Sequence, residues 1–420
     1  MSLFHPSPDV HHPSQSGEPI SFSEAVLDSS RAHRVVPEKY HELLDELLEN
    51  IHAFCREFKI PNEALKNVDT FGDFLRASAI PQDKMAEAVL FFQQLEHLVT
   101  HKEPLREILS THLQEAERLY HLQEQYAVQV ELIKALGILN VRGDIKGVDG
   151  KSYPLPTVEQ IAERLCDPER KEFFATKREQ KFTKLLLVPF GMSLDSLIDF
   201  FKYFLLDYQK QHPEFALDIE EPVWVGDSYQ DADADYSRGL RYFPRYIDGV
   251  EHQGRTKLQI LEEQKTDSTG SISGWHILLL QAPHNNEELG FRRIPRSLRG
   301  DTEGGVGWRD DVESCKTPEE YFSMLETAKT DSYDEYFGES GMTPEDWIMA
   351  FMTHLEETGE PLDNFSNRKD CAGYLACMNQ GYLFAPRWNQ KEPQVELNCY
   401  HRLGVSGALD DTGMRLVVEV

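Results

Sequence analysis

The spacing of the apolar residues changes at Gly137, and this change divides the chain into two parts of different character. Before Gly137, apolar side chains recur every three or four residues, which is the period of an amphipathic α-helix. These stripes predict helices over 37–60, 82–99 and 104–136, and glycine is a common residue at the end of a helix. We therefore expect an antiparallel helical bundle or coiled-coil hairpin over residues 36–139.

Long apolar stripes of this kind favour packing or assembly, so a homo-oligomer formed through residues 37–137 is one expectation. The segment before the stripes, residues 1–35, is rich in Pro, Ser and His and is predicted to be a disordered tail. It has no basic start followed by an apolar core, and we therefore expect no secretory signal.

After Gly137, short strand patterns alternate with helix patterns. Residues 182–190 and 274–281 are apolar runs bounded by Pro or Gly, which is typical of buried strands. Residues suited to capping a helix precede the helical patterns at four positions, Thr157, Ser193, Thr317 and Thr343. The last strand is expected over 413–420. The sequence thus predicts an α+β protein, with a mixed α+β region over residues 140–420.

The charge of the chain excludes several classes of partner. There are 72 acidic and 43 Lys or Arg residues, which gives a net charge of −29. A field of this sign repels the phosphates of nucleic acids and anionic membrane surfaces. The apolar runs are also far shorter than the roughly 20 residues of a membrane-spanning helix. We therefore expect a soluble protein without a nucleic-acid or membrane partner, and a cytoplasmic location by default.

The six cysteines include no Cys-x-x-Cys pair, which argues against a zinc knuckle or a redox motif. We expect reduced thiols, with a disulfide among Cys371, Cys377 and Cys399 as the alternative. The acidic run that begins at Asp231 resembles the start of an EF-hand loop. Such a loop needs Gly and Glu where this chain has Tyr236 and Tyr242. The sequence therefore predicts no cofactor and leaves an irregular calcium site as an alternative.

One dense basic patch occurs in this acidic chain, and it consists of Arg292, Arg293, Arg296 and Arg299. Arginine forks suit phosphates and carboxylates, so the patch is a candidate anion site. Pairing with the protein's own carboxylates is the favoured alternative. An enzyme acting on a small anionic substrate, with Asp301 or Glu303 as the base, remains an alternative function.

A polar segment with interspersed aromatic residues lies near the C-terminus. Its candidate ligand-binding residues are Trp388, Asn389, Gln390, Gln394, Glu396, Asn398, Tyr400 and His401. Tyr and Trp offer large rigid contact areas, and Asn and Gln offer adaptable hydrogen bonds, as in recognition loops. The segment therefore predicts a recognition surface for a protein or glycan. The alternative for Trp388 is that its ring fills the core.

The end of the chain resembles a known family. The run from Gly413 to Val418, Gly-Met-Arg-Leu-Val-Val, is similar to the closing strand of C-type-lectin-like domains related to formylglycine-generating enzyme. Trp388, the loop through Tyr400 and His401, and the turn at 410–411 are similar to the preceding part of those domains. The resemblance implies a C-type-lectin-like C-terminal part, and in some bacterial members this part is the variable region of a diversity-generating retroelement.

Two departures from that family limit what the resemblance implies. The Gly-Asn-Val-Trp-Glu-Trp segment is absent, and no cysteine pair lies in the family's catalytic context. The resemblance therefore implies a scaffold with a binding face, of the kind that is diversified in the retroelement proteins, rather than an oxidase. Taken with the residues, it predicts a ligand-binding protein without catalysis. A structural adaptor assembled through the N-terminal helices is the second alternative to this function, beside the enzyme.

Overall fold

The structure is a computed structural model, and it divides the chain into two compact units. It describes residues 29–61, 82–102, 105–234, 239–242, 254–266, 272–283, 289–294, 316–364, 372–379, 382–401 and 412–420. The first unit covers residues 1–111 and the second covers residues 112–420. Each unit has a hydrophobic core of its own.

The first unit is helical, as its apolar stripes predict. It contains α2 (Ser29–Val35), the 3-10 turn η1 (Glu38–Tyr40), α3 (His41–Glu57) and α5 (Gln82–His101). The buried face of α3 carries Leu44, Leu48 and Ile51, which recur at the helical period and share a core with residues of α5. Helix α2 lies within the segment predicted to be a tail, and residues 1–28 are outside the described residues.

The single helix predicted over 104–136 is in fact two helices. The first is α6 (Leu105–Tyr120), and the second is α7 (Leu122–Ala135). His121 separates them, and its φ of 52° places it in the left-handed region. Helix α7 packs on strand β3 (Phe182–Val188) of the second unit. The boundary expected between residues 139 and 140 is therefore too late, because α7 buries its apolar face against the α+β part of the chain.

Two glutamines on α7 complete the hydrogen bonds of β3, which is an edge strand. The Gln125 side chain accepts from the N–H of Leu185 at 2.8 Å and donates to the carbonyl of Thr183 at 3.1 Å. One turn later, Gln129 accepts from the N–H of Leu187 at 2.7 Å and donates to the carbonyl of Leu185. The two amides thus take the place of a neighbouring strand along this edge.

The central sheet has the order β3-β6-β15-β7 and is antiparallel throughout. Its other strands are β6 (His276–Gln281), β15 (Leu416–Glu419) and β7 (Glu339–Gly341). Strands β3 and β6 are the apolar runs predicted from the sequence, and β15 is the later part of the single strand expected over 413–420, whose first residues belong to a different sheet. The side chains of these three strands are largely buried. The closing strand β15 therefore lies inside the sheet, between β6 and β7.

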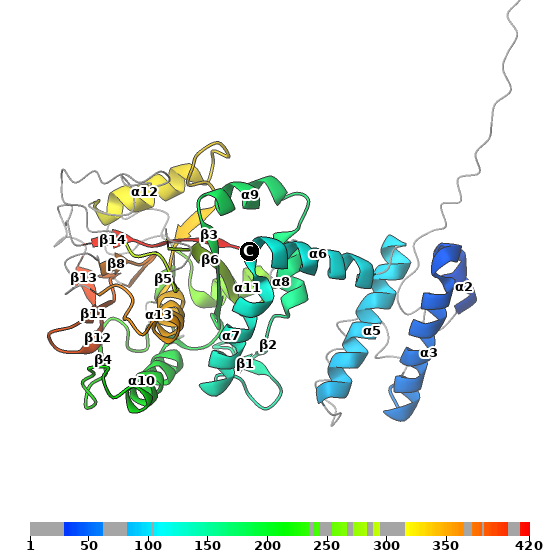
Figure 1. Ribbon diagram of the computed structural model, residues 1–420, viewed down its shortest axis with the longest axis horizontal. Helices are drawn as coiled ribbons and strands as arrows, with labels where there is room; N and C mark the ends of the chain where they lie inside the picture. Colours follow the sequence, from blue (N-terminus) through cyan, green and yellow to red (C-terminus); the bar gives the residue numbers. More distant parts are fainter. Residues whose placement is uncertain are drawn as a thin grey trace, which may run out of the picture. The chain divides into compact units, whose positions relative to one another are not determined.

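Helices pack around this sheet, and their N-termini carry the predicted caps. Figure 1 shows α10 (Leu194–Gln211) and α13 (Pro344–Thr358) side by side, and α13 also contacts β3. The remaining helices are α8 (Val158–Leu165), α9 (Lys171–Glu179), α11 (Lys257–Thr266) and α12 (Pro318–Ala328). Complete capping boxes begin α8, α12 and α13, and Ser193 caps α10, which confirms those four predictions.

Small sheets complete the second unit. The strands β11 (Arg387–Asn389) and β12 (Gln394–Leu397) form a hairpin, and β12 also pairs in parallel with β4 (Val223–Val225). A second sheet has the order β13-β10-β9-β5. Its strands are β13 (Cys399–His401), β10 (Tyr382–Phe384), β9 (Cys377–Asn379) and β5 (Arg241–Tyr242). There are also two separate two-stranded sheets. One pairs β1 (Asp144–Lys146) with β2 (Ser152–Pro154), and the other pairs β8 (Ala372–Tyr374) with β14 (Thr412–Met414).

The α+β class predicted from the sequence is confirmed by these elements. Within the described ranges, none of the helices combines the length and apolarity that a membrane crossing requires. Cys377 and Cys399 are free thiols, so the disulfide alternative fails for this pair. Cys371 lies outside the described residues.

Candidate functional site

Most of the predicted recognition residues lie in the β11–β12 hairpin, whose two faces have different surroundings. Successive residues of a strand point to opposite faces, so Trp388 and Val395 share one face. That face is the core: Trp388 is 3% exposed, and its ring packs against Phe215 at 5.3 Å and Phe351 at 6.2 Å between centroids. The structure therefore places Trp388 in the core, as in the alternative reading of this residue, and not on an accessible surface.

The opposite face of the hairpin carries a polar cluster. We call Arg387, Asn389, Glu396, Asn398 and Tyr400 the Glu396 cluster, because four of its contacts converge on that carboxylate or on its arginine partner. Glu396 accepts from Nε of Arg387 at 2.6 Å, from the Asn389 amide at 2.7 Å and from the Asn398 amide at 3.5 Å. A further N–H of Arg387 donates to the hydroxyl of Tyr400 at 3.3 Å. Four of the eight predicted residues thus meet in one cluster.

An exposed tryptophan adjoins this cluster. In the parallel pairing of β12 with β4, Glu396 lies opposite Trp224, and paired residues of neighbouring strands point to the same face. Arg387 is paired with Glu396 on the other side, so the three residues form one row across the sheet. Trp224 is 39% exposed, whereas the Glu396 carboxylate is mostly covered by its partners. Trp224 was missed in the sequence because its strand reads only as a short apolar run.

The other predicted residues of this segment occupy different positions. Gln394, which shares the Glu396 face of β12, is 7% exposed, and its side-chain oxygen has no hydrogen-bond partner in the described part of the chain. Gln390 is exposed in the turn after β11, and His401 ends β13.

The arginine patch is split between partners within the protein. Arg292 is buried and donates to the Gln281 side chain at 3.1 Å. Arg293 pairs with Glu360 at the surface. The favoured alternative, pairing with the protein's own carboxylates, therefore describes Arg293, whereas Arg292 donates to the amide of Gln281. Arg296 and Arg299, with Asp301 and Glu303, lie outside the described residues.

Arg415 of the Gly-Met-Arg ending anchors the closing strand. It pairs with the buried carboxylate of Asp363 at 2.6 Å and donates to the backbone carbonyl of Arg292. The second oxygen of Asp363 accepts from the indole of Trp347 at 2.9 Å. Arg415 is 8% exposed, so its role in the structure is to join β15 to the loop after α13.

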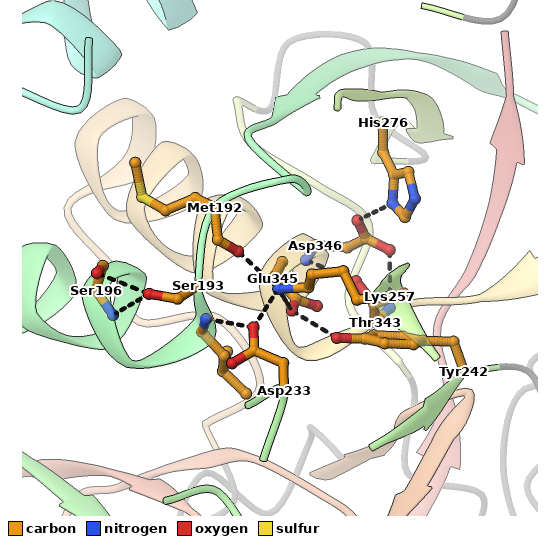
Figure 2. Close-up of polar contacts among 11 residues, drawn as sticks. Met192, Ser193, Ser196, Asp233, Tyr242, Lys257, His276, Thr343, Glu345 and Asp346 are labelled. Atoms are coloured by element: carbon orange, nitrogen blue, oxygen red, sulfur yellow. Dashed lines mark hydrogen bonds and ion pairs between the residues drawn. The ribbon is translucent and has the colours of Figure 1, made fainter. Parts of the chain in front are cut away.

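A buried ionic network, which the sequence did not reveal, lies between α10, α11 and α13 (Figure 2). The Lys257 ammonium contacts Asp233 at 2.6 Å, Glu345 at 2.7 Å and the carbonyl of Met192 at 2.7 Å. Burial alone would lower the pKa of Lys257, but the two carboxylates outweigh it and raise the pKa. Asp233 belongs to the run considered for calcium, and it is occupied by Lys257 instead. No group of three metal-ligating side chains occurs among the described residues.

Two buried histidines lie near the central sheet in opposite environments. Burial lowers the pKa of His276, but Asp346, at 2.9 Å from its Nδ1, more than compensates and the pKa is raised. The ring of His276 also stacks on Phe190 at 3.9 Å between centroids. His354 instead accepts from the N–H of Phe291 at 3.0 Å. Burial, followed by the charges of Arg415, Arg293 and Lys184, lowers its pKa to about 3.

Comparisons with family models, with curated proteins and with solved structures find no match to this chain.

Proposed function

We propose that this protein is a ligand-binding protein that recognises a neutral glycan through the face of the β11–β12–β4 sheet that carries the Glu396 cluster and Trp224. The observation that carries the proposal is the row formed by Arg387, Glu396 and Trp224, in which an exposed indole adjoins an ordered polar group. An indole offers a flat apolar surface to a sugar ring, and the polar side chains beside it offer donors and acceptors to hydroxyl groups.

The charge of this face favours a neutral ligand. The chain as a whole carries a net charge of −29, but the charge of Glu396 is balanced by Arg387 at 2.6 Å. The remaining polar members of the Glu396 cluster are the uncharged Asn389, Asn398 and Tyr400. An anionic ligand would meet the repulsive field of an acidic protein, and the paired Arg387 and Glu396 leave no net charge in this row to hold a cation. A hydroxyl-rich neutral ligand needs no net charge on this face.

The hydrogen bonds within the Glu396 cluster support a binding role for this face, because they fix its polar side chains in place. The amides of Asn389 and Asn398 are already oriented by Glu396, so little conformational entropy is lost when a ligand binds. The C-type-lectin-like character of the C-terminal part, expected from the sequence, remains part of this proposal.

The test is a glycan array probed with the labelled full-length protein, followed by calorimetry on the bound sugars. We expect Trp224→Ala to weaken binding at least about tenfold, as for an aromatic hot spot. Tyr203→Ala is the matched control, because Tyr203 is an aromatic residue of α10 that is 54% exposed. Both variants should melt at the wild-type temperature.

Two outcomes would refute this function. One is the absence of any array binding by wild-type protein that is folded. The other is sugar binding that Trp224→Ala and Tyr203→Ala leave equally unchanged, since the binding face would then lie elsewhere.

A further inference from the structure

The buried network around Lys257 contains the groups for a covalent reaction within the chain. The exposed fractions of the Lys257, Asp233 and Glu345 side chains are 1%, 3% and 0%. Figure 2 shows the ammonium between the two carboxylates, with Tyr242 beside Glu345. The ring of Phe190 lies 5.3 Å from the Lys257 nitrogen and adds an apolar wall. An amine and a carboxyl group are thus held together where water is excluded.

From this geometry we propose that Lys257 and Asp233 condense into an intramolecular isopeptide bond, with Glu345 as the proton carrier. The bond that forms joins Nζ of Lys257 to Cγ of Asp233, and the bond that breaks is one C–O bond of the Asp233 carboxyl group. The ammonium and the carboxylate together contain all the atoms of the amide and of one water molecule. The reaction therefore needs no oxidant, reductant or other reactant.

Glu345 is placed to move the proton. It contacts the ammonium at 2.7 Å through Oε1, so it can accept a proton and leave a neutral amine to attack Cγ. Its Oε2 is buried and has no hydrogen-bond partner in the described part of the chain, which leaves room for that proton. Glu345 then returns this proton to the departing oxygen of Asp233. The attacking nitrogen loses a second proton, which Glu345 passes to the same oxygen, so the oxygen leaves as water and Glu345 ends the reaction unchanged.

The surroundings select Asp233 over Glu345 as the carboxyl group that reacts. The backbone N–H of Leu194, at the start of α10, donates to Oδ2 of Asp233 at 2.8 Å. A donor fixed in this position stabilises the negative charge that develops on the carboxyl oxygen during attack. The Tyr242 hydroxyl instead donates to Glu345 at 2.8 Å and stabilises its carboxylate form, which is the form that can accept the Lys257 proton.

Burial of the two groups favours both the rate and the equilibrium of the condensation. Holding the two reacting groups in contact replaces a bimolecular encounter by a step within one molecule. Buried charges carry a large desolvation penalty, and the amide removes one positive and one negative charge from the interior. The carboxylates raise the pKa of Lys257, so the ammonium is the resting form and Glu345 must take its proton before the amine can attack.

The test is mass spectrometry of the natively purified full-length protein, after prolonged incubation at growth temperature. Wild type and Lys257→Arg are each compared with their own sequence mass. We expect only wild type to be lighter by one water, and its digest to contain a peptide that joins Asp233 to Lys257. Glu345→Gln should lack both signatures, because the proton carrier is gone.

The chain also offers a matched control in the same digest. Lys265 of α11 contacts Asp149 at 3.1 Å and Glu262 at 3.0 Å, so it has the same three chemical groups. Glu262 is 69% exposed, and water reaches this trio, so no joined peptide is expected there. A folded wild-type protein at its full sequence mass, without the Asp233–Lys257 peptide, would overturn the proposal whether or not the variants fold.

Discussion

At the scale of single residues, two buried histidines show how neighbours decide a protonation state. His354 is buried and His276 is only slightly exposed, so burial by itself disfavours the charged form of each. His276 faces the carboxylate of Asp346 and gains a raised pKa. His354 faces a backbone N–H and three cationic side chains, and its pKa falls to about 3. The two residues therefore couple folding to pH with opposite signs.

The dependence of folding stability on pH that His354 causes can be measured with the variant His354→Gln. Glutamine keeps a side-chain acceptor for the N–H of Phe291. An unfolded histidine binds a proton near pH 6.5, whereas native His354 stays neutral down to pH of about 3. The unfolded state therefore binds more protons in this window, and the unfolding free energy falls as the pH falls.

Between pH 7 and pH 5 we expect the unfolding free energy of wild type to fall by about 2 kcal/mol more than that of the variant. Urea unfolding at each pH measures this difference. The other titrating groups, His276 included, are common to both proteins and cancel in the difference. Parallel pH profiles for the two proteins would contradict the assigned environment of His354.

The residue scale also shows where sequence reasoning stops. Thr157, Thr317 and Thr343 were predictable caps because their partners lie three residues away. Trp388 was not predictable, since the alternation of a strand defines two faces without saying which one is buried. Lys257 was missed for a related reason. Its partners come from three separate segments, and only the folded chain brings them together.

At the scale of elements, α7 explains why the predicted domain boundary was too late. Its apolar stripe is the same in a helical bundle and against a sheet, so periodicity alone could not tell which partner it covers. The deciding residues are Gln125 and Gln129, which occupy the buried side of the helix and bond to the backbone of β3. Buried glutamines at this spacing are the signal that sequence reasoning could have used.

Substituting Gln129 should therefore destabilise the protein through β3. Gln129→Met keeps the length of the side chain but leaves the N–H of Leu187 and the carbonyl of Leu185 without these bonds. We expect a loss of about 2–4 kcal/mol in unfolding free energy, because each unsatisfied buried group costs about 1–3 kcal/mol. The control is Gln123→Met, at an exposed position of the same helix, which should change the unfolding free energy by less than about 0.5 kcal/mol.

Chemical denaturation of the two glutamine variants measures this difference directly. Equal stability of Gln129→Met and Gln123→Met would mean that the contact of α7 with β3 contributes nothing to the native state.

At the scale of the whole molecule, the two hydrophobic cores imply two folding units. The buried residues of the second core all lie at or after Ala116, and those of the first core all lie at or before Val99. A unit with a contiguous core of its own can fold alone. The Glu396 cluster, Trp224 and the Lys257 network all belong to the second unit.

A fragment of residues 105–420 should therefore melt in one cooperative transition, within about 4 °C of the corresponding transition of the full chain. Differential scanning calorimetry of both proteins measures this, with the full chain as the control. A fragment that aggregates or melts without cooperativity would show that the second unit depends on residues before 105.

The glutamine cover of β3 has a consequence for the order in which the chain is made. Helix α7 leaves the ribosome before β3 does, whereas the strand that pairs with the other side of β3, β6, is synthesised almost ninety residues after β3. The edge of β3 that contacts α7 thus has its partner as soon as β3 is synthesised. The edge that pairs with β6 has no partner until β6 is synthesised. Nascent chains with open strand edges are prone to aggregate. During synthesis, therefore, the vulnerable side of this strand is the one that ends up in the middle of the sheet.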